Sequence, residues 1–350
     1  MSAAATSPGS PAPAAPAAPV AVLGAGSWGT ALAIQFARSG HPTRLWGRDR
    51  EQSARMARER RNARYLPDAP FPDALQVAAT LDAALEGARD LLVAVPSHAL
   101  RATLGELRPR LRLRPELRLA WATKGFELDS GLLPNEVARE VLGEDVPIAV
   151  LSGPTFAREV GAGLPTAMVV ASPEPAFATA LATSLSSSNF RAYTSTDITG
   201  VEVGGAVKNV MAVGAGLSDG LGFGANTRIA LITRGLVEMT RLGVALGARR
   251  ETFMGLAGLG DLVLTCTDDQ SRNRRFGLAL ARGSGAEAAL AGIGQVVEGY
   301  VAARAVHAVA LRHGVSMPIV EGLYRTLFEG VPAREVVRAL MTRPIKSEFD

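Results

Sequence analysis

The sequence predicts an α/β N-terminal domain built on a doubly wound sheet, followed by an all-α C-terminal domain. A glycine-rich turn joins the first apolar run to a helical pattern, and further short apolar runs alternate with helical segments as far as about residue 195. After residue 196 apolar residues recur only at helical spacing. We therefore expect a disordered Ala/Pro-rich tail over 1–18, a sheet domain over 19–195 and a helical domain over 196–345.

The first glycine-rich turn has the pattern Gly24-x-Gly26-x-x-Gly29 between an apolar strand and a helix. In this context Gly24 allows a tight turn, Gly26 lets the backbone approach a pyrophosphate, and Gly29 lets the helix lie close to the strand. The amides of Ser27 and Trp28 at the helix start would face the anion. The sheet domain is therefore predicted to be a Rossmann-like dinucleotide-binding domain.

The end of the second predicted strand indicates which dinucleotide binds. An acidic residue there would hold the ribose hydroxyls of NAD and repel the extra phosphate of NADP. The strand instead ends in Trp46-Gly47-Arg48, with Asp49 one residue later. Because Arg48 would accept a 2′-phosphate, we expect NADP or NAD to bind, with NADPH favoured. An ordinary exposed arginine is the alternative.

Later strand-like runs also end in polar or turn residues. Pro96, Lys124 and Gly153 each follow such a run directly. Ligands of doubly wound sheets bind at the carboxyl ends of the strands, so these residues and Ser27 are expected to line one crevice. Thr155 is expected to cap the helix that follows it.

Lysine is rare in this chain, which makes its positions informative. Of 37 basic residues only Lys124, Lys208 and Lys346 are lysines, and Lys208 with Asn209 interrupts an apolar helical segment. A buried lysine amine, or one near other cations, can lose its proton, which an arginine does not. Lys208 is therefore a candidate for proton transfer. The alternative is a lysine whose amine reaches solvent at a helix edge.

The stretch at 271–275 offers hydrogen-bond donors for an anion. Ser271, Arg272 and Asn273 combine a guanidinium with small polar groups, a set suited to phosphate, whereas Arg274 and Arg275 are expected to be solvated or to pack against the chain. A dinucleotide, a proton-donating lysine and a phosphate site together predict hydride transfer to a small phosphorylated ketone, or from the matching alcohol.

Two acidic residues lie at predicted helix starts in the helical domain. Asp261 follows a glycine turn, and Glu298 follows Gly294 by four residues. Capping of the helix N-terminus is the simplest role for each.

The composition argues against other classes of site and partner. The net charge of +4 is too small to indicate nucleic-acid binding, and no apolar run reaches the roughly 18 residues that span a bilayer. The four histidines show no metal-ligand spacing, so no metal is expected. Cys266 is the only cysteine, which excludes an intrachain disulfide and indicates a reducing compartment.

Several longer motifs occur in order from about residue 20 to the C-terminus: GAGSWGTALA, VPSH, WATKG, SGPTFA, GGAVKNV, SDGLGFGAN, AGLGDLVLTCT, SRNRRFG and GQVVEGY. In these motifs the sequence resembles bacterial NAD(P)-dependent glycerol-3-phosphate dehydrogenases. The resemblance implies reduction of dihydroxyacetone phosphate to sn-glycerol 3-phosphate, a precursor of phospholipids. It also implies a cytoplasmic homodimer and a helical domain that binds substrate and carries catalysis.

The resemblance further implies roles for individual residues. Lys208 would be the proton donor and acceptor. Substrate would contact Lys124, Gly153, Thr155, Lys208, Asp261, Ser271, Arg272 and Asn273. The cofactor would contact the three glycines of the first turn and Ser27, Trp28, Arg48, Lys124, Ala157, Arg272, Val296 and Glu298.

Two other functions remain open from the sequence. A 3-hydroxyacid dehydrogenase also joins a Rossmann domain to helices that carry a lysine and a nearby asparagine. A non-catalytic NAD(P)-binding sensor would show a continuous basic face for its partner or nucleic acid.

Overall fold

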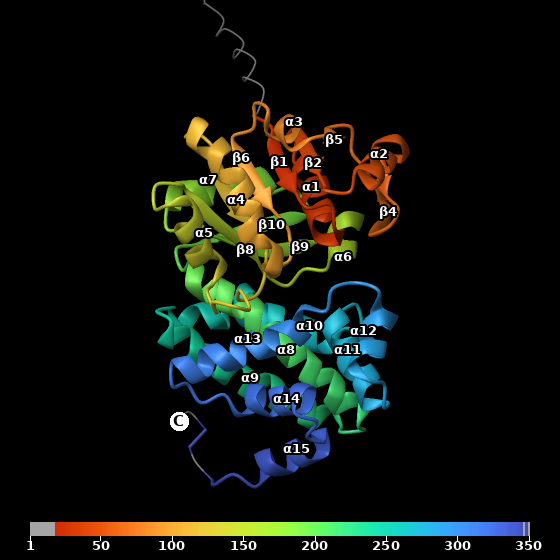
Figure 1. Ribbon diagram of the computed structural model, residues 1–350, viewed down its shortest axis with the longest axis vertical. Coiled ribbons are helices and arrows are strands. Elements are labelled where there is room, and N and C mark those ends of the chain that lie inside the picture. Colours follow the sequence, from red (N-terminus) through yellow and green to blue (C-terminus); the bar gives the residue numbers. More distant parts are fainter. Residues whose placement is uncertain (1–17, 346, 349–350) are drawn as a thin grey trace, which may run out of the picture.

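The computed structural model describes residues 18–345 and 347–348. A half that contains the main sheet and a half made of helices lie at opposite ends of the molecule (Figure 1). The prediction of a disordered tail over 1–18 lies, except for residue 18, outside the described residues. None of the described helices has both the length and the apolar character that crossing a membrane requires.

The main sheet contains the strands β1 (Val20–Leu23), β2 (Thr43–Trp46), β5 (Leu75–Val77), β6 (Asp90–Val93), β7 (Arg118–Trp121), β8 (Ile148–Ser152), β9 (Thr166–Ala171) and β10 (Phe190–Ser195). Their order is β10-β9-β8-β7-β6-β1-β2-β5. Neighbouring strands are parallel except β8 and β9, so β9 and β10 run opposite to the rest. The carboxyl ends of β1, β6, β7 and β8 therefore meet at one edge of the sheet.

Helices cover both faces of this sheet. They are α1 (Ser27–Arg38), α2 (Arg50–Glu59), α3 (Leu81–Leu85), α4 (Ser97–Leu113), α5 (Pro134–Leu142), α6 (Ala157–Ala162) and α7 (Pro175–Leu185). In β1, Val20 and Val22 pack with α1, α2, α6 and α7, whereas Ala21 and Leu23 pack with α3, α4 and α5. Alternate strand residues thus enter two different cores, as the period of two requires.

The helical half contains α8 (Ile198–Gly220), α9 (Ala225–Ala245), α10 (Asp261–Thr267), α11 (Arg272–Ala281), α12 (Ala286–Ile293), α13 (Glu298–Arg312), α14 (Pro318–Phe328) and α15 (Ala333–Met341). A 3₁₀ turn (Arg250–Met254) and a π-helical turn (Leu256–Gly260) connect α9 to α10. Helix α8 packs against α9, α10, α11 and α13 and is buried along most of its length.

Small residues explain how so many helices approach α8. A Cβ atom at Gly216 would lie 2.0 Å from the carbonyl oxygen of Arg274, and one at Gly277 would lie 2.1 Å from that of Val213. Only glycine allows α8 and α11 to cross this closely. The crossing brings the segment that follows Ser271 against the helix that carries Lys208.

The predicted fold class is confirmed: strands alternate with helices up to Ser195, and no strand follows among the described residues. The domain bounds themselves stay a prediction. A short antiparallel hairpin of β3 (Arg61–Asn62) and β4 (Leu66–Pro70) was not predicted from the sequence.

Candidate active site

A cavity of about 500 Å³ lies between the sheet half and the helical half. Residues of α1, α6, α8 and α11 line it, together with the loop after β7. Predicted site residues make up much of the lining: Ser27, Trp28, Lys124, Thr155, Ala157, Lys208, Ser271, Arg272, Asn273 and Glu298. The fold therefore brings together residues that lie far apart in the sequence.

The edge of the parallel sheet supplies one wall of this cavity. Ser27 follows β1, Lys124 follows β7 and Thr155 follows β8. Pro96 and Gly153 belong to the same edge but do not line the cavity. Gly153 is instead required by packing, because a Cβ atom there would lie 2.9 Å from the Cα atom of Met168.

Two lysines share one buried carboxylate beside the cavity. Lys124 Nζ donates a hydrogen bond to Asp261 Oδ2 at 2.7 Å, and Lys208 Nζ donates to Asp261 Oδ1. Asp261 is 0% exposed, and Thr265 Oγ1 donates to its carbonyl oxygen at 2.6 Å. The capping interpretation of Asp261 is wrong, because this residue begins α10 and its side chain makes no capping bond.

Burial changes the proton affinity of Lys208. Desolvation and, to a lesser extent, the positive charge of Lys124 outweigh the attraction of Asp261 and together lower the pKa of its amine from 10.5 to about 8. The side chain is only 7% exposed, so the alternative of an amine in solvent is wrong. The lowered pKa makes this amine a better proton donor than an unperturbed lysine.

A chain of side-chain amides lies next to Lys208. Asn273 Nδ2 donates to Asn209 Oδ1 at 2.8 Å, and Asn209 Nδ2 donates to Glu298 Oε2 at 3.1 Å. The backbone amide of Gly299 donates to Asn273 Oδ1 at 2.9 Å. Glu298 is the first residue of α13, whose N-terminus has no side-chain cap, so the capping interpretation is wrong for this residue too. Its carboxylate instead connects α13 to Asn209 of α8 and, through Asn209, to Asn273 of α11.

The residues of the arginine-rich stretch have different environments. Ser271 caps α11 by accepting a hydrogen bond from the amide of Arg274 at 3.2 Å. Arg274 is buried and forms ion pairs with Asp219, at 2.6 Å, and with Asp269, so it packs against the chain. Arg275 is exposed and borders the cavity. Arg272 faces the cavity, and its Nη1 donates to Gln295 Oε1 at 3.2 Å.

We expect Arg272→Ala to weaken substrate binding more than it slows turnover. The variant removes a cavity-facing guanidinium, and a charge-assisted hydrogen bond contributes about 1.5–3 kcal/mol, so KM should rise roughly 10- to 150-fold. Steady-state kinetics with the phosphorylated substrate measures the change. Arg282→Ala, which truncates an arginine that does not line the cavity, is the control. An unchanged KM for Arg272→Ala would contradict the assignment.

The first glycine turn fits the pyrophosphate of a dinucleotide. Gly24 has a φ of +113°, and Gly29 lies so close to it that a Cβ atom would be 1.9 Å from the Gly24 carbonyl oxygen. Nothing lies within 4 Å of a Cβ position at Gly26, which leaves room for a ligand. The N-terminus of α1 has no side-chain cap and no acidic residue in its first turn. Trp28 Nε1 is buried and has no partner among the described residues.

Two other predicted cofactor residues lie outside the lining of the cavity. Arg48 and Val296 are exposed and do not line the cavity. The Asp49 carboxylate accepts a hydrogen bond from the backbone amide of Gln52 at 3.0 Å and so caps α2.

Thr155 does not cap α6 as predicted. Phe156 is the N-cap residue of that helix, and Thr155 Oγ1 donates to the carbonyl oxygen of Gly153 at 3.3 Å.

Several residues that line the cavity had no predicted site role. Asn209 is one of them, and its only signal in the sequence is that it interrupts an apolar helical segment. Tyr65 and Leu66 line the cavity from the β3–β4 hairpin, which has no clear sequence signal. In residues 18–345 and 347–348, no group of three or more His, Cys, Asp and Glu residues could hold a metal ion.

Comparison with known proteins gives the family. The N-terminal model of NAD-dependent glycerol-3-phosphate dehydrogenase matches residues 19–178, and the C-terminal model matches residues 197–338. Proteins named glycerol-3-phosphate dehydrogenase [NAD(P)+] from Aeromonas hydrophila and Klebsiella pneumoniae are 58% and 56% identical to this chain. Each alignment covers 93% of this chain, and 98% or 96% of the relative.

A solved structure agrees with these matches. The crystal structure of glycerol-3-phosphate dehydrogenase from Coxiella burnetii superposes with a TM-score of 0.89 and 46% sequence identity. The superposition covers 93% of this chain and 99% of that protein. The matched models, the two relatives and the superposed structure together show that this chain belongs to the NAD-dependent glycerol-3-phosphate dehydrogenase family, whose members use NAD or NADP.

Proposed function

We propose that the chain catalyses the reversible NAD(P)H-dependent reduction of dihydroxyacetone phosphate to sn-glycerol 3-phosphate. The names of its relatives support the reaction. The observation that carries the proposal is the buried Lys124–Asp261–Lys208 arrangement beside a cavity that Arg272 also lines. The site thus combines a proton donor, Lys208, with a cation for the substrate phosphate, Arg272.

In the proposed reaction Lys208 Nζ gives a proton to the carbonyl oxygen as that oxygen becomes an alcohol. The nicotinamide supplies the hydride when it is bound. Asp261 holds both ammonium groups in place, and Lys124 lowers the pKa of Lys208 and adds positive charge where the oxygen becomes negative. In the reverse direction the neutral Lys208 amine accepts the proton.

Other residues position the two ligands. Arg272 contacts the substrate phosphate and lies against the cofactor, while Ser271 and Asn273 hold the start of α11 in place through their own hydrogen bonds. The free amides of α1 bind the pyrophosphate. Arg48 binds the 2′-phosphate, which favours NADPH over NADH.

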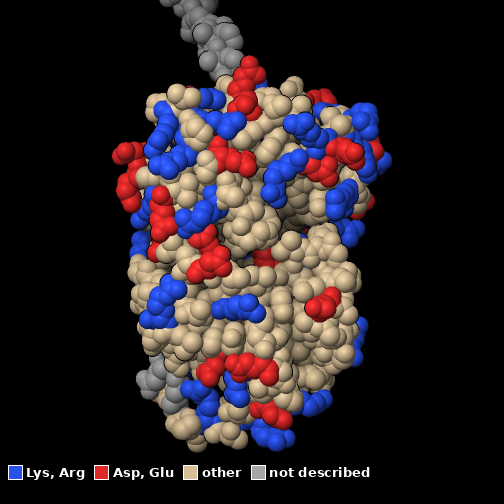
Figure 2. Space-filling model, in the orientation of Figure 1, with Lys and Arg blue, Asp and Glu red and all other residues tan. Residues whose placement is uncertain are grey.

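An assay with purified protein tests the function. We expect NADPH absorbance to fall with dihydroxyacetone phosphate and not with a 3-ketoacid, and NADH to be used less efficiently. Activity on the ketoacid alone would favour the 3-hydroxyacid dehydrogenase alternative. On the face in Figure 2 basic and acidic side chains are interspersed, without the continuous basic surface expected of a nucleic-acid-binding sensor.

The resemblance to bacterial enzymes supports three further parts of the proposal. The chain acts as a homodimer, it works in the cytoplasm, and its product enters phospholipid synthesis.

A further inference from the structure

The loop that carries Lys124 is held against the helical half of the molecule. Trp121, the last residue of β7, lies before the loop, and Asn135, near the start of α5, lies after it. Between them, the side chains of Phe126 and Leu133 are buried in a core formed mainly by residues of the helical half. The loop is therefore part of the sheet half in sequence but packs with the helical half.

Both flanks of this loop bind one buried carboxylate of α8. Trp121 Nε1 donates a hydrogen bond to Glu202 Oε1 at 2.7 Å. The backbone amide of Asn135 donates to the same oxygen at 3.1 Å, and Asn135 Nδ2 donates to Glu202 Oε2. Glu202 is only 4% exposed, and the groups that bind it are all donors, so its carboxylate satisfies several buried N–H groups at once.

The part of α8 that follows Glu202 contacts the Lys124 side chain. Glu202, Gly205 and Lys208 follow one another at intervals of three residues, so successive members of this series are neighbours on the helix surface. A Cβ atom at Gly205 would lie 3.4 Å from Lys124 Cγ, so the stem of Lys124 packs on α8 between Glu202 and Lys208. The Glu202 carboxylate therefore ties the Lys124 loop to the part of α8 that leads to Lys208.

Two ammonium groups that share one carboxylate need such support. Lys124 and Lys208 both donate to Asp261, and their like charges repel each other. Besides desolvation, the charge of Lys124 lowers the pKa of Lys208. If the loop moved away from α8, Lys208 would be less desolvated and farther from that charge, and its pKa would rise.

From these contacts we propose that Glu202 is a positioning residue for the reaction. It fixes the Lys124 loop against α8 through its hydrogen bonds and so sets the distance between the Lys124 and Lys208 ammonium groups. The effect of Glu202 on turnover rests on the proposed function, whereas its effect on the two lysines does not.

NMR titration of isotope-labelled lysine in the full chain tests the proposal, because the sequence has only the lysines Lys124, Lys208 and Lys346. Lys208→Arg identifies the signal of Lys208 by its loss. Glu202→Ala removes the acceptor, so we expect the pKa of Lys208 to rise by about one pH unit. We also expect kcat to fall at least about tenfold, because a displacement of roughly 1 Å in an active site is enough for such a loss.

Glu202→Gln separates the hydrogen bonds of Glu202 from its charge. The new amide oxygen can accept from Trp121 Nε1 and from the Asn135 backbone, and Asn135 can turn its own amide to accept from the new NH₂ group. We therefore expect Glu202→Gln to keep the pKa of Lys208 and most of the turnover. A shift as large as in Glu202→Ala would assign the effect to charge and overturn the proposal.

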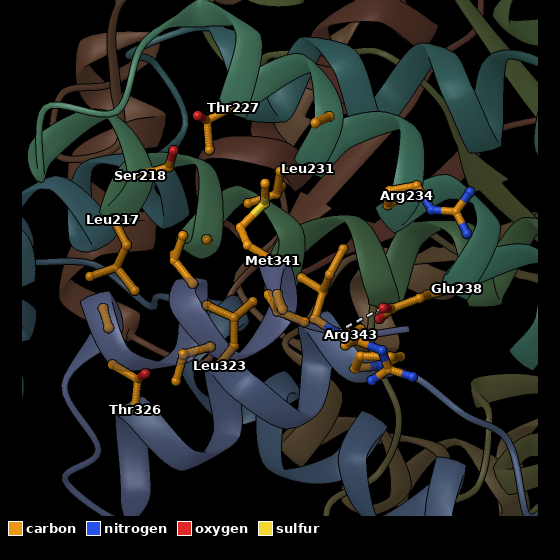
Figure 3. A pocket seen from close by; sticks show the side chains of 18 of the residues that line it. Leu217, Ser218, Thr227, Leu231, Arg234, Glu238, Leu323, Thr326, Met341 and Arg343 are labelled. Carbon is orange, nitrogen blue, oxygen red and sulfur yellow. Dashed lines mark hydrogen bonds between the residues drawn. The ribbon is translucent and has the colours of Figure 1, made fainter. Parts of the chain in front are cut away.

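Glu238→Ala is the matched control. Glu238 is also 4% exposed, and it accepts the backbone amides of Ile319, at 2.7 Å, and Val320, at 3.2 Å, at the start of α14. It borders a second cavity, of about 620 Å³, among α8, α9, α14 and α15 (Figure 3). None of the described residues that line this cavity lines the active site. Glu238→Ala should therefore lose stability but keep the pKa of Lys208.

The other charged or titratable groups near Lys208 and Glu202 are the same in all these variants. They are Asp261 and Cys266 of α10, the cavity-lining Asp269, Arg272, Arg275 and Glu298, and Glu136 beside Glu202. A changed pKa of Lys208 in Glu202→Ala therefore reports the position of the Lys124 loop.

Asn135→Ala decides the question if Glu202→Ala does not fold. It removes one donor to the carboxylate and leaves Glu202 in place, so we expect a smaller rise in the pKa of Lys208. The proposal is wrong if neither variant raises this pKa, or if Glu238→Ala raises it equally. An unmodified chain that does not reduce dihydroxyacetone phosphate would refute the proposed function instead, and the NMR titration would still decide whether Glu202 positions the lysines.

Discussion

Replacing Lys208 by arginine should reduce turnover about 10²–10⁴-fold, the usual contribution of general acid–base catalysis. Arginine keeps the positive charge beside Asp261 but does not release a proton at accessible pH. Steady-state and single-turnover kinetics with NADPH and dihydroxyacetone phosphate measure the effect. Near-normal turnover in Lys208→Arg would end the assignment of this amine as proton donor.

The pH dependence of catalysis distinguishes two causes of a slow Lys208→Arg variant: the loss of a proton donor and a mispositioned side chain at residue 208. Reduction requires the protonated amine, so kcat/KM for the ketone should be constant at low pH and fall as the pH rises through about 8. Oxidation of the alcohol requires the neutral amine and should rise over the same range. In Lys208→Arg both changes near this pH should disappear. A profile that keeps them would assign the titration to another group.

Chemical rescue provides a matched control for the size of the side chain. In Lys208→Cys, alkylation with 2-bromoethylamine builds an amine close to the original position and should restore part of the lost turnover. The only other cysteine, Cys266, is fully buried, and burial raises the pKa of its thiol to about 12, so it should not react. The same treatment of Lys208→Arg should change nothing.

The sequence predicted those parts of the molecule whose signals are local. The glycine turn lies between a strand and a helix that are both adjacent in the chain, so its role could be inferred from neighbouring residues. Lys208 was recognisable because a lysine in an apolar helix needs an explanation. The alternation of strands and helices likewise predicted the sheet half.

Contacts between residues that lie far apart in the sequence could not be predicted in the same way. Asp261 lies 53 positions from Lys208 and 137 from Lys124, and nothing in its own neighbourhood distinguishes a carboxylate that holds two lysines from one that caps a helix. Arg274 differs from its exposed neighbour Arg275 only because the close crossing of α8 and α11 places it against Asp219. Tertiary packing, rather than local preference, determines these roles.

Replacing Asp261 by asparagine should have the second large effect, on both activity and stability. The variant leaves two buried ammonium groups without their shared carboxylate, and removing one partner of a buried ion pair costs about 3–5 kcal/mol. We expect the free energy of unfolding to fall by about that amount near neutral pH, as measured by urea denaturation. Asp73→Asn, at an exposed carboxylate, should change it by less than about 1 kcal/mol.

The pH dependence of this loss follows from the pKa of Lys208. In the folded chain that pKa is about 8, below the 10.5 of an unperturbed lysine, so the unfolded chain binds more protons between these values and stability rises with pH there. Without the attraction of Asp261, the pKa of Lys208 in the folded chain falls further. The rise of stability with pH therefore begins at a lower pH in the variant. The deficit of Asp261→Asn should therefore shrink as the pH is raised toward 8. A deficit that is independent of pH would mean that Asp261 supports the fold by packing and not by holding the charge on Lys208.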